Sequence, residues 1–226
     1  MGFNGDKKEG RWFLEKIEKK LLQWLLPKVP RGIETYHLTL STLLWSALIV
    51  VFSYMTRWSI HFLWGVSLMI VAQYLTDMLD GAVGRARDTG LVKWGFYMDH
   101  FLDYIFLCAI LIGYRLMAND HHKYPLFYVL ALFGAYMVNS FLSFAADGKF
   151  KISYLGVGPT EVRLFFILVN TFIILLHNRY EAVWFLPVVL TIATLGLIGN
   201  ICWTQKQLWE ADMEAKRRAE QGPWRR

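Results

Sequence analysis

Residues 38–56 have the sequence LTLSTLLWSALIVVFSYMT, in which no side chain is charged. This length is close to the ~20 residues that an α-helix needs to cross a bilayer. Uncharged stretches of similar length follow at residues 126–146 and 182–203. They are continuously apolar and do not alternate with a period of two, which disfavours a transmembrane β-barrel. The sequence therefore predicts an all-α, polytopic membrane protein.

The composition of the whole chain agrees with this prediction. Of its 226 residues, 55% are hydrophobic and only 19% are charged, and the mean hydropathy is +0.32. Cys108 and Cys202 lie in apolar segments without CxxC or Cys/His spacing, so we expect neither a disulfide framework nor a zinc site. Residues 1–11 lead into an amphipathic stretch without a small-residue cleavage site, which argues against a cleaved signal peptide.

An amphipathic segment precedes the first apolar stretch. Between Trp12 and Leu26 the apolar residues recur at helical spacing, and Lys and Glu fill most other positions. This pattern predicts a helix lying along the membrane interface and ending at Pro27 and Pro30. Six crossings are then expected, at residues 38–56, 60 to about 80, 91 to about 114, 126–146, about 159–177 and 182–203.

The basic residues predict the orientation, because Lys and Arg are enriched in cytoplasmic segments. The segments up to His37, from Arg85 to Lys93, from Lys149 to Arg163 and after Trp203 hold 20 of the 24 basic residues. We therefore expect a cytoplasmic N-terminal tail with the interfacial helix (1–37), a six-helix transmembrane domain (38–203) and a cytoplasmic C-terminal tail (204–226). Topology and anionic lipid headgroups account for the net charge of +6, so no nucleic-acid partner is inferred.

Four acidic residues stand out within the apolar chain: Asp77, Asp80, Asp99 and Asp103. Carboxylates at membrane depth are costly and usually functional. The first two are spaced i,i+3 and the last two i,i+4, so each pair shares one face of its helix. The predicted topology brings both pairs to the same depth near the cytoplasmic surface. We expect the four carboxylates to converge there, on the cytoplasmic side.

Such a cluster needs cations, because like charges in a low-dielectric environment repel one another. Ligands that are all oxygen suit Mg²⁺ or Mn²⁺, and a pair of ions bridged by carboxylates stabilises phosphoryl displacement. The segment between the pairs supplies Gly81, Gly84, Gly90 and a phosphate-binding residue, Arg85. This combination suggests a diphosphate substrate.

The residues that carry these groups resemble a known signature. Asp77-Met-Leu-Asp80-Gly81-Ala-Val-Gly84-Arg85, nine further residues and Gly95-Phe-Tyr-Met-Asp99-His-Phe-Leu-Asp103 match seven of the eight fixed positions of D-x2-D-G-x2-A-R-x8/9-G-x3-D-x3-D. That signature belongs to the CDP-alcohol phosphotransferases, also called CDP-alcohol phosphatidyltransferases. Gly84 stands where the family usually has Ala. Six spans with the motif across the second and third also resemble the family's transmembrane core.

The resemblance implies a transferase of phospholipid biosynthesis that moves a substituted phosphate from a CDP-alcohol to an acceptor alcohol and releases CMP. The implied metal ligands, for two Mg²⁺ or Mn²⁺ ions, are Asp77, Asp80, Asp99 and Asp103. Asp103 would also be the general base. Gly81 and Arg85 would contact the CDP moiety, and Gly95 would leave room for the nucleotide. The expected partners are the CDP-alcohol, a lipid or polar acceptor alcohol and membrane lipids, and a homodimer stays open.

The choice of acceptor is less constrained. Family members with phosphorylated soluble acceptors often carry two arginines at the start of the fifth span. This chain has one arginine there, Arg163. Further candidate contacts for the acceptor or headgroup are Lys149, Lys151 and Glu161. Gly-Pro-Thr-Glu-Val at residues 158–162 is similar to choline and ethanolamine phosphotransferases, which favours a diacylglycerol acceptor. The alternatives are a CDP-diacylglycerol-dependent phosphatidyltransferase with a small polar acceptor, an intramembrane prenyltransferase, or a non-enzymatic cation-coupled transporter.

Overall fold

The computed structural model describes residues 8–9, 15–117, 123–147, 150–151, 158–176 and 186–220. The α-helices in this part of the chain are α1 (Glu15–Leu25), α2 (Thr35–Met55), α3 (Leu63–Ala86), α4 (Val92–Met117), α5 (Lys123–Asp147), α6 (Pro159–Leu175) and α7 (Leu186–Glu220). Short 3₁₀ helices at Leu26–Lys28 and Ile60–Phe62 precede α2 and α3. The two-residue strands β1 (Lys8–Glu9) and β2 (Phe150–Lys151) pair in parallel. The predicted all-α class is confirmed.

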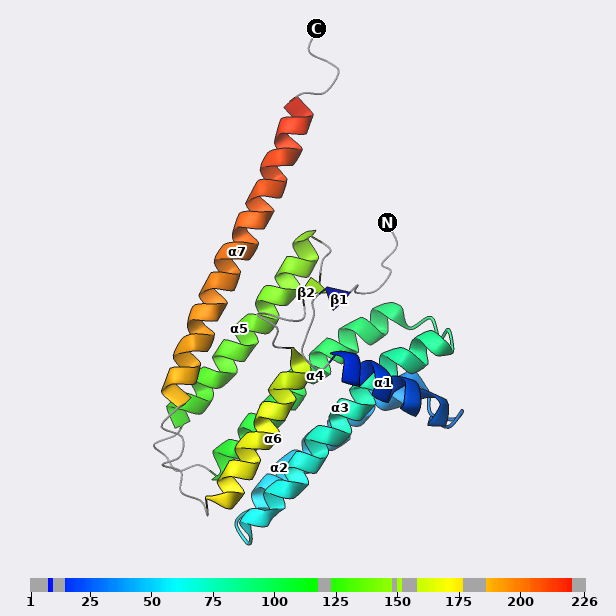
Figure 1. Cartoon of the computed structure of the whole chain (residues 1–226), viewed down its shortest axis with the longest axis vertical. Coiled ribbons are helices and arrows are strands. Elements are labelled where there is room, and N and C mark those ends of the chain that lie inside the picture. The colour runs from blue at the N-terminus through cyan, green and yellow to red at the C-terminus, as the bar shows by residue number, and fades with distance from the viewer. Residues whose placement is uncertain are drawn as a thin grey trace.

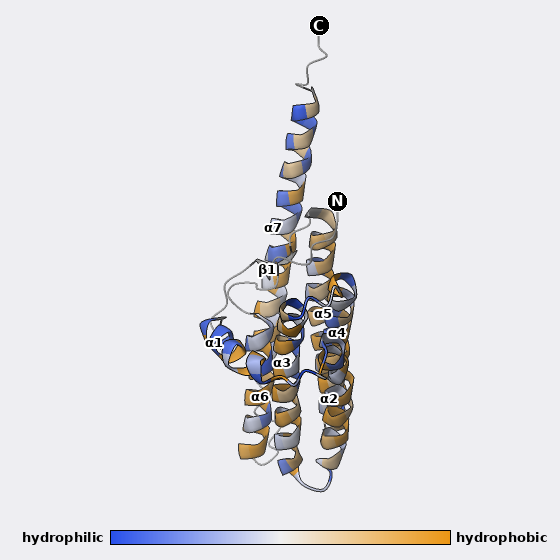
Figure 2. Ribbon diagram, turned by 90° about the vertical axis from the view of Figure 1, so that its right-hand side faces the viewer, coloured by the Kyte–Doolittle hydropathy of each residue, from blue (hydrophilic) through white to orange (hydrophobic). Residues whose placement is uncertain are grey.

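Five helical segments are long and apolar enough to cross a bilayer: Thr35–Met55, Ile60–Ala86, Val92–Met117, Tyr124–Ala146 and Pro187–Ala219. They correspond to five of the six predicted crossings. The segment predicted at about 159–177 contains α6, which has 17 residues. Its crossing of the bilayer therefore stays a prediction. Apolar residues predominate along the helices of the bundle, whereas α1 and the C-terminal part of α7 are more hydrophilic (Figure 2).

The helices run roughly side by side in one elongated bundle (Figure 1). α2 packs against α3 and α4, α6 packs against α3, and α7 lies along α5. Ile49, Ile70 and Ile110, from α2, α3 and α4, are almost completely buried in the core. A Cβ atom at Gly113 of α4 would overlap the Ser53 side chain of α2, so glycine at this position allows the close approach of the two helices.

The last helix is longer than expected. α7 continues without a break from Leu186 to Glu220, through the predicted boundary between residues 203 and 204. Its C-terminal part extends beyond the other helices (Figure 1). Within residues 204–220 the chain has no Gly or Pro and many good helix formers, so the helix has no local reason to end at the last apolar residue.

The amphipathic helix α1 lies across the bundle at the level of α3 (Figure 1). It ends at Leu25 and Pro27 falls in the 3₁₀ turn that follows, whereas Trp12, its predicted start, lies outside the described residues. Glu18 accepts hydrogen bonds from Tyr74 of α3 (3.1 Å) and from Thr160 of α6. These bonds attach α1 to both helices.

A single arginine organises the linker from α1 to α2. The Arg87 guanidinium, just after α3, donates to the carbonyl oxygens of Val29, Pro30, Arg31 and Ile33. It also lies 3.7 Å from the Glu34 carboxylate. The linker is therefore held against the end of α3, close to the acidic residues.

Candidate functional site

Three of the four predicted carboxylates lie together. Asp77 on α3 and Asp99 and Asp103 on α4 each offer an oxygen atom, and these atoms lie within 4.8 Å of one another. All three residues are partly buried. Asp99 and Asp103 are four residues apart on α4, and α3 and α4 both pack against α2, which brings the three carboxylates together. We call Asp77, Asp99 and Asp103 the acidic cluster.

The fourth residue, Asp80, is buried beside this cluster and is not one of the three. Its carboxylate accepts hydrogen bonds from the Thr39 hydroxyl (2.8 Å) and from the Gly81 amide. The Thr35 hydroxyl donates to the Asp80 carbonyl oxygen (2.7 Å). Two threonines of α2 thus help to fix the orientation of the Asp80 carboxylate and backbone. The expectation that all four carboxylates converge holds for three of them in the structure.

A cation from another helix lies in the cluster. Arg163 of α6 is 7% exposed, and its Nη2 atom lies 2.9 Å from Asp77 Oδ2 and 3.2 Å from Asp103 Oδ1. Its Nε atom donates to Gln73 Oε1 at 2.8 Å. Gln73 is fully buried, and its Nε2 atom lies 3.5 Å from Asp103 Oδ1. Arg163, which the sequence suggested as an acceptor contact, is therefore an ion-pair partner of two cluster residues.

His100 contacts the same cluster from its edge. Its Nδ1 atom lies 3.2 Å from Asp99 Oδ2, and its ring stacks on Phe141 of α5 with a centroid separation of 5.5 Å. Phe96 packs on it at 4.4 Å. His100 thus orients Asp99 and links the cluster to α5.

The predicted nucleotide-binding residues lie in the last turns of α3 and the first turn of α4, on either side of the α3–α4 turn. A Cβ atom at Gly81 would lie 3.2 Å from an Arg85 Nη atom, so the guanidinium covers this glycine. At Gly95 a Cβ atom would meet nothing within 4 Å, which leaves open space beside the start of α4. Asp88 and Gly90 adopt positive φ angles of 50° and 69°, as the tight reversal into α4 requires.

Gly84, the departure from the signature, faces Thr35. A Cβ atom there would lie 3.3 Å from Thr35 Oγ1, which is tighter than an ordinary contact. The threonine that binds Asp80 therefore uses the space that an alanine would take. The smaller Gly84 thus makes room for the Thr35 side chain.

The candidate acceptor residues are only partly described. Glu161 caps α6, where its carboxylate accepts a hydrogen bond from the Gly158 amide at 2.9 Å. Lys149 lies outside the described residues, and Lys151 belongs to β2, of which only the backbone is described. Among the described acceptor candidates, Arg163 alone contacts the acidic cluster.

Sequence reasoning did not single out Gln73, Thr35, Thr39, Tyr74 or Glu18. Gln73 carried a signal, because it is a polar residue in an apolar run four residues, about one helical turn, before Asp77. The threonines carried none, since Ser and Thr are common in membrane helices, where they bond to backbone carbonyls.

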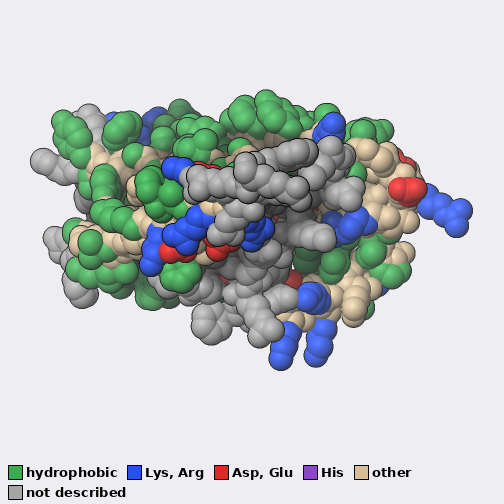
Figure 3. Space-filling view, turned by 90° about the horizontal axis from the view of Figure 1, so that it is seen from above, with side chains coloured by type: hydrophobic (Ala, Val, Ile, Leu, Met, Phe, Trp, Pro, Cys, Tyr) green, Lys and Arg blue, Asp and Glu red, His purple; other side chains and the backbone are tan. Residues whose placement is uncertain are grey.

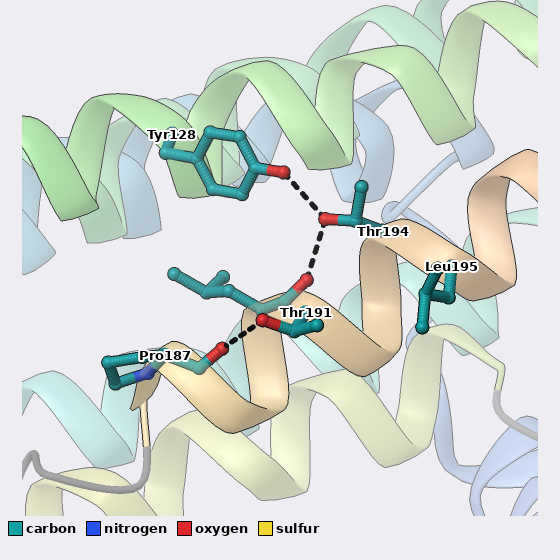
Figure 4. Close-up of a pocket in the computed structure, with 6 residues that line it drawn as sticks. Tyr128, Pro187, Thr191, Thr194 and Leu195 are labelled. Atoms are coloured by element: carbon teal, nitrogen blue, oxygen red, sulfur yellow. Dashed lines mark hydrogen bonds between the residues drawn. The ribbon is translucent and has the colours of Figure 1, made fainter.

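A surface hollow of about 410 Å³ lies elsewhere, between α5 and α7 (Figure 4). Its hydroxyl groups bind one another or the backbone: Tyr128 Oη lies 2.6 Å from Thr194 Oγ1, which donates to Leu190, and Thr191 donates to Pro187. It contains no acidic residue. This hollow offers little to a charged substrate.

The acidic cluster fits a divalent cation, because its donors are carboxylate oxygens at a mutual distance suited to a shared ion. Such a cluster in a helical membrane protein, with Gly81 and Arg85 nearby on α3, is typical of membrane enzymes that act on phosphorylated substrates.

The family comparison is more specific. The model of the CDP-alcohol phosphatidyltransferase family matches residues 37–201, and the chain belongs to this family. The family consists of phosphotransferases that are generally metal-dependent and act on CDP-alcohol and lipid substrates in the membrane. No curated protein and no solved structure gave a significant match to the chain.

Proposed function

We propose that this protein transfers a substituted phosphate from a CDP-alcohol to an acceptor alcohol and releases CMP. The observation that carries the proposal is the grouping of Asp77, Asp99 and Asp103 within 4.8 Å, at the position of the family signature. With Asp80 beside them, these residues would hold two Mg²⁺ or Mn²⁺ ions. Such ions, when bound, neutralise the diphosphate and the charge that develops during displacement.

The remaining steps belong to the chain's own residues. The acceptor oxygen attacks the β-phosphorus. The bond between the β-phosphorus and the oxygen that bridges the two phosphates breaks, and CMP leaves with the bridging oxygen. Asp103 takes the proton of the acceptor hydroxyl. Gly81 and Arg85 hold the CDP moiety, and the open space at Gly95 accommodates the nucleotide. Arg163 lies where it can contact a phosphoryl oxygen beside Asp77 and Asp103.

The acceptor proposed is diacylglycerol, with CDP-choline or CDP-ethanolamine as donor. The engagement of the single Arg163 with two cluster carboxylates supports this choice, because an arginine bound there is poorly placed to hold a separate acceptor phosphate. A CDP-diacylglycerol-dependent transfer to a small polar acceptor is the second candidate. A cation-coupled transporter is less consistent with a family of phosphotransferases.

We propose that the site opens to the cytoplasm. The α3–α4 turn lies toward the same end of the bundle as β1 and the C-terminal end of α7 (Figure 1), and Lys and Arg side chains are visible on this end when it is seen from above (Figure 3). Basic residues at one end favour a cytoplasmic location for that end.

The test is CMP release by the purified protein with CDP-choline, CDP-ethanolamine or CDP-diacylglycerol, each with Mg²⁺ or Mn²⁺. Turnover with one donor and its loss on chelation are expected. Full turnover in excess EDTA would contradict the metal assignment, and no CMP release from any donor would contradict the proposed function.

A further inference from the structure

Gln73 is a buried polar residue beside the acidic cluster that the family signature does not contain. It lies on α3, one helical turn before Asp77, and none of its surface is exposed. A buried carboxamide is costly unless its donor and acceptor groups are satisfied. Both ends of this side chain are directed at residues around the cluster.

Gln73 determines which edge of the Arg163 guanidinium faces the carboxylates. Its Oε1 atom accepts from Arg163 Nε at 2.8 Å, and the guanidinium is planar, so this bond sets the plane of the whole group. Nη2 then lies between Asp77 Oδ2 (2.9 Å) and Asp103 Oδ1 (3.2 Å). The aromatic rings of Tyr74 and Phe106, at 5.9 and 6.0 Å, flank the same group.

We infer that Gln73 is a positioning residue that holds Arg163 across the acidic cluster, where the guanidinium and a divalent cation compete for the oxygens of Asp77 and Asp103. This inference deepens the proposed function and rests on it for the catalytic consequence. When phosphoryl oxygens and cations are present, Gln73 keeps its bond to Nε, and Nη2 stays directed at the reacting groups. The positive charge is therefore retained at the site.

The first experiment measures Mn²⁺ affinity and does not require turnover. Gln73→Met keeps the length of the side chain but removes both hydrogen-bonding ends. It should raise Mn²⁺ affinity about tenfold, since Arg163 loses a charge-assisted hydrogen bond that holds it on the carboxylates. Arg163→Met should raise the affinity at least as much. In a protein that already carries Arg163→Met, the additional Gln73→Met substitution should not raise the Mn²⁺ affinity further.

The outcomes separate positioning from a general structural role. The inference would be overturned if Gln73→Met changed the Mn²⁺ affinity equally in the wild-type and the Arg163→Met protein. It would also be overturned if Gln73→Met changed the affinity in neither protein. Gln73→Asn retains the carboxamide one methylene short of Arg163 and should act in the same direction, so the test survives if the Met variant does not fold.

Asn170 provides the matched control. It is also a fully buried carboxamide in this bundle, but it binds Ser67 (3.0 Å) and Tyr114 (2.9 Å) instead of the cluster. Asn170→Leu should leave Mn²⁺ affinity unchanged in both backgrounds.

The second experiment repeats the cycle with CMP release. Gln73→Met and Arg163→Met should each lower kcat at least tenfold with a smaller change in KM, and the double variant should be no slower than Arg163→Met alone. Additive losses would overturn the inference. If the wild-type protein releases CMP from no donor, the proposed function fails, whereas the Mn²⁺ cycle still decides the role of Gln73.

Discussion

Arg163→Met tests whether the buried guanidinium neutralises the acidic cluster. Removing one partner of a buried ion pair costs about 3–5 kcal/mol, because the other charge stays in a low-dielectric environment. The lower end applies here, since the side chains of Asp77 and Asp103 are 22% and 30% exposed. A loss of about 3 kcal/mol corresponds to a midpoint about 6–12 °C lower for a chain of this length. Thermal unfolding in detergent with EDTA measures it.

Mn²⁺ should restore most of this loss. At a concentration 100 times its Kd, a ligand that binds only the folded state stabilises it by about 2.7 kcal/mol. The wild-type protein should gain less, because Mn²⁺ must displace the Arg163 ion pairs. Arg87→Met, which removes an arginine bound to the α1–α2 linker, should lose the same stability with and without Mn²⁺. An Arg163→Met protein that unfolds at the wild-type temperature in EDTA would refute the reasoning.

Three further predictions concern chemistry, Asp80 and sidedness. Asp103→Asn should lower kcat by about two orders of magnitude while CDP-alcohol binding survives, as expected for a lost general base, and unchanged turnover would remove it from the mechanism. Asp80→Asn should weaken Mn²⁺ and CDP-alcohol binding together, and Thr39→Val should weaken both about tenfold, as equilibrium titrations would measure. A cysteine introduced at Thr89 should react with an impermeant thiol reagent only in inverted or permeabilised vesicles, whereas a cysteine at Asn119 should react from outside. Labelling of the Thr89 cysteine in intact cells would show that the orientation is the opposite of the one proposed.

The helical spans were predictable because membrane crossing depends on a local property, the length of an apolar stretch. The position of Arg163 was not, since it depends on how α6 is rotated against α3, and residues 86 positions apart meet there. Thr39 and Asp80, which also meet, are 41 positions apart in the chain. The motif spacing within α3 and α4 did predict the grouping of Asp77, Asp99 and Asp103, because those helices are adjacent in sequence and joined by a short turn.

The contact of α1 with the bundle connects this amphipathic helix to the site. Glu18 accepts hydrogen bonds from Tyr74 on α3 and Thr160 at the start of α6, the two helices that carry Gln73, Asp77 and Arg163. The apolar residues Ile17 and Trp24 of the same helix are exposed, as expected for a helix that also contacts lipid. The Glu18 carboxylate thus joins α1 to α3 and α6, the two helices whose side chains form the ion pair of Arg163 with Asp77.

Glu18→Ala should release α1 while the bundle stays folded. The variant loses two hydrogen bonds to a partly buried carboxylate, worth about 2 kcal/mol together at this level of exposure. Amide hydrogen exchange in residues 15–25 should accelerate about 30-fold, because 1.4 kcal/mol corresponds to a factor of ten in the opening equilibrium. Exchange in α2 should not change, since Arg87 separately holds the linker at Val29–Ile33. Glu210→Ala, on the exposed part of α7, is the matched control. Unchanged protection of α1 in the Glu18 variant would show that the two Glu18 hydrogen bonds do not hold this helix on the bundle.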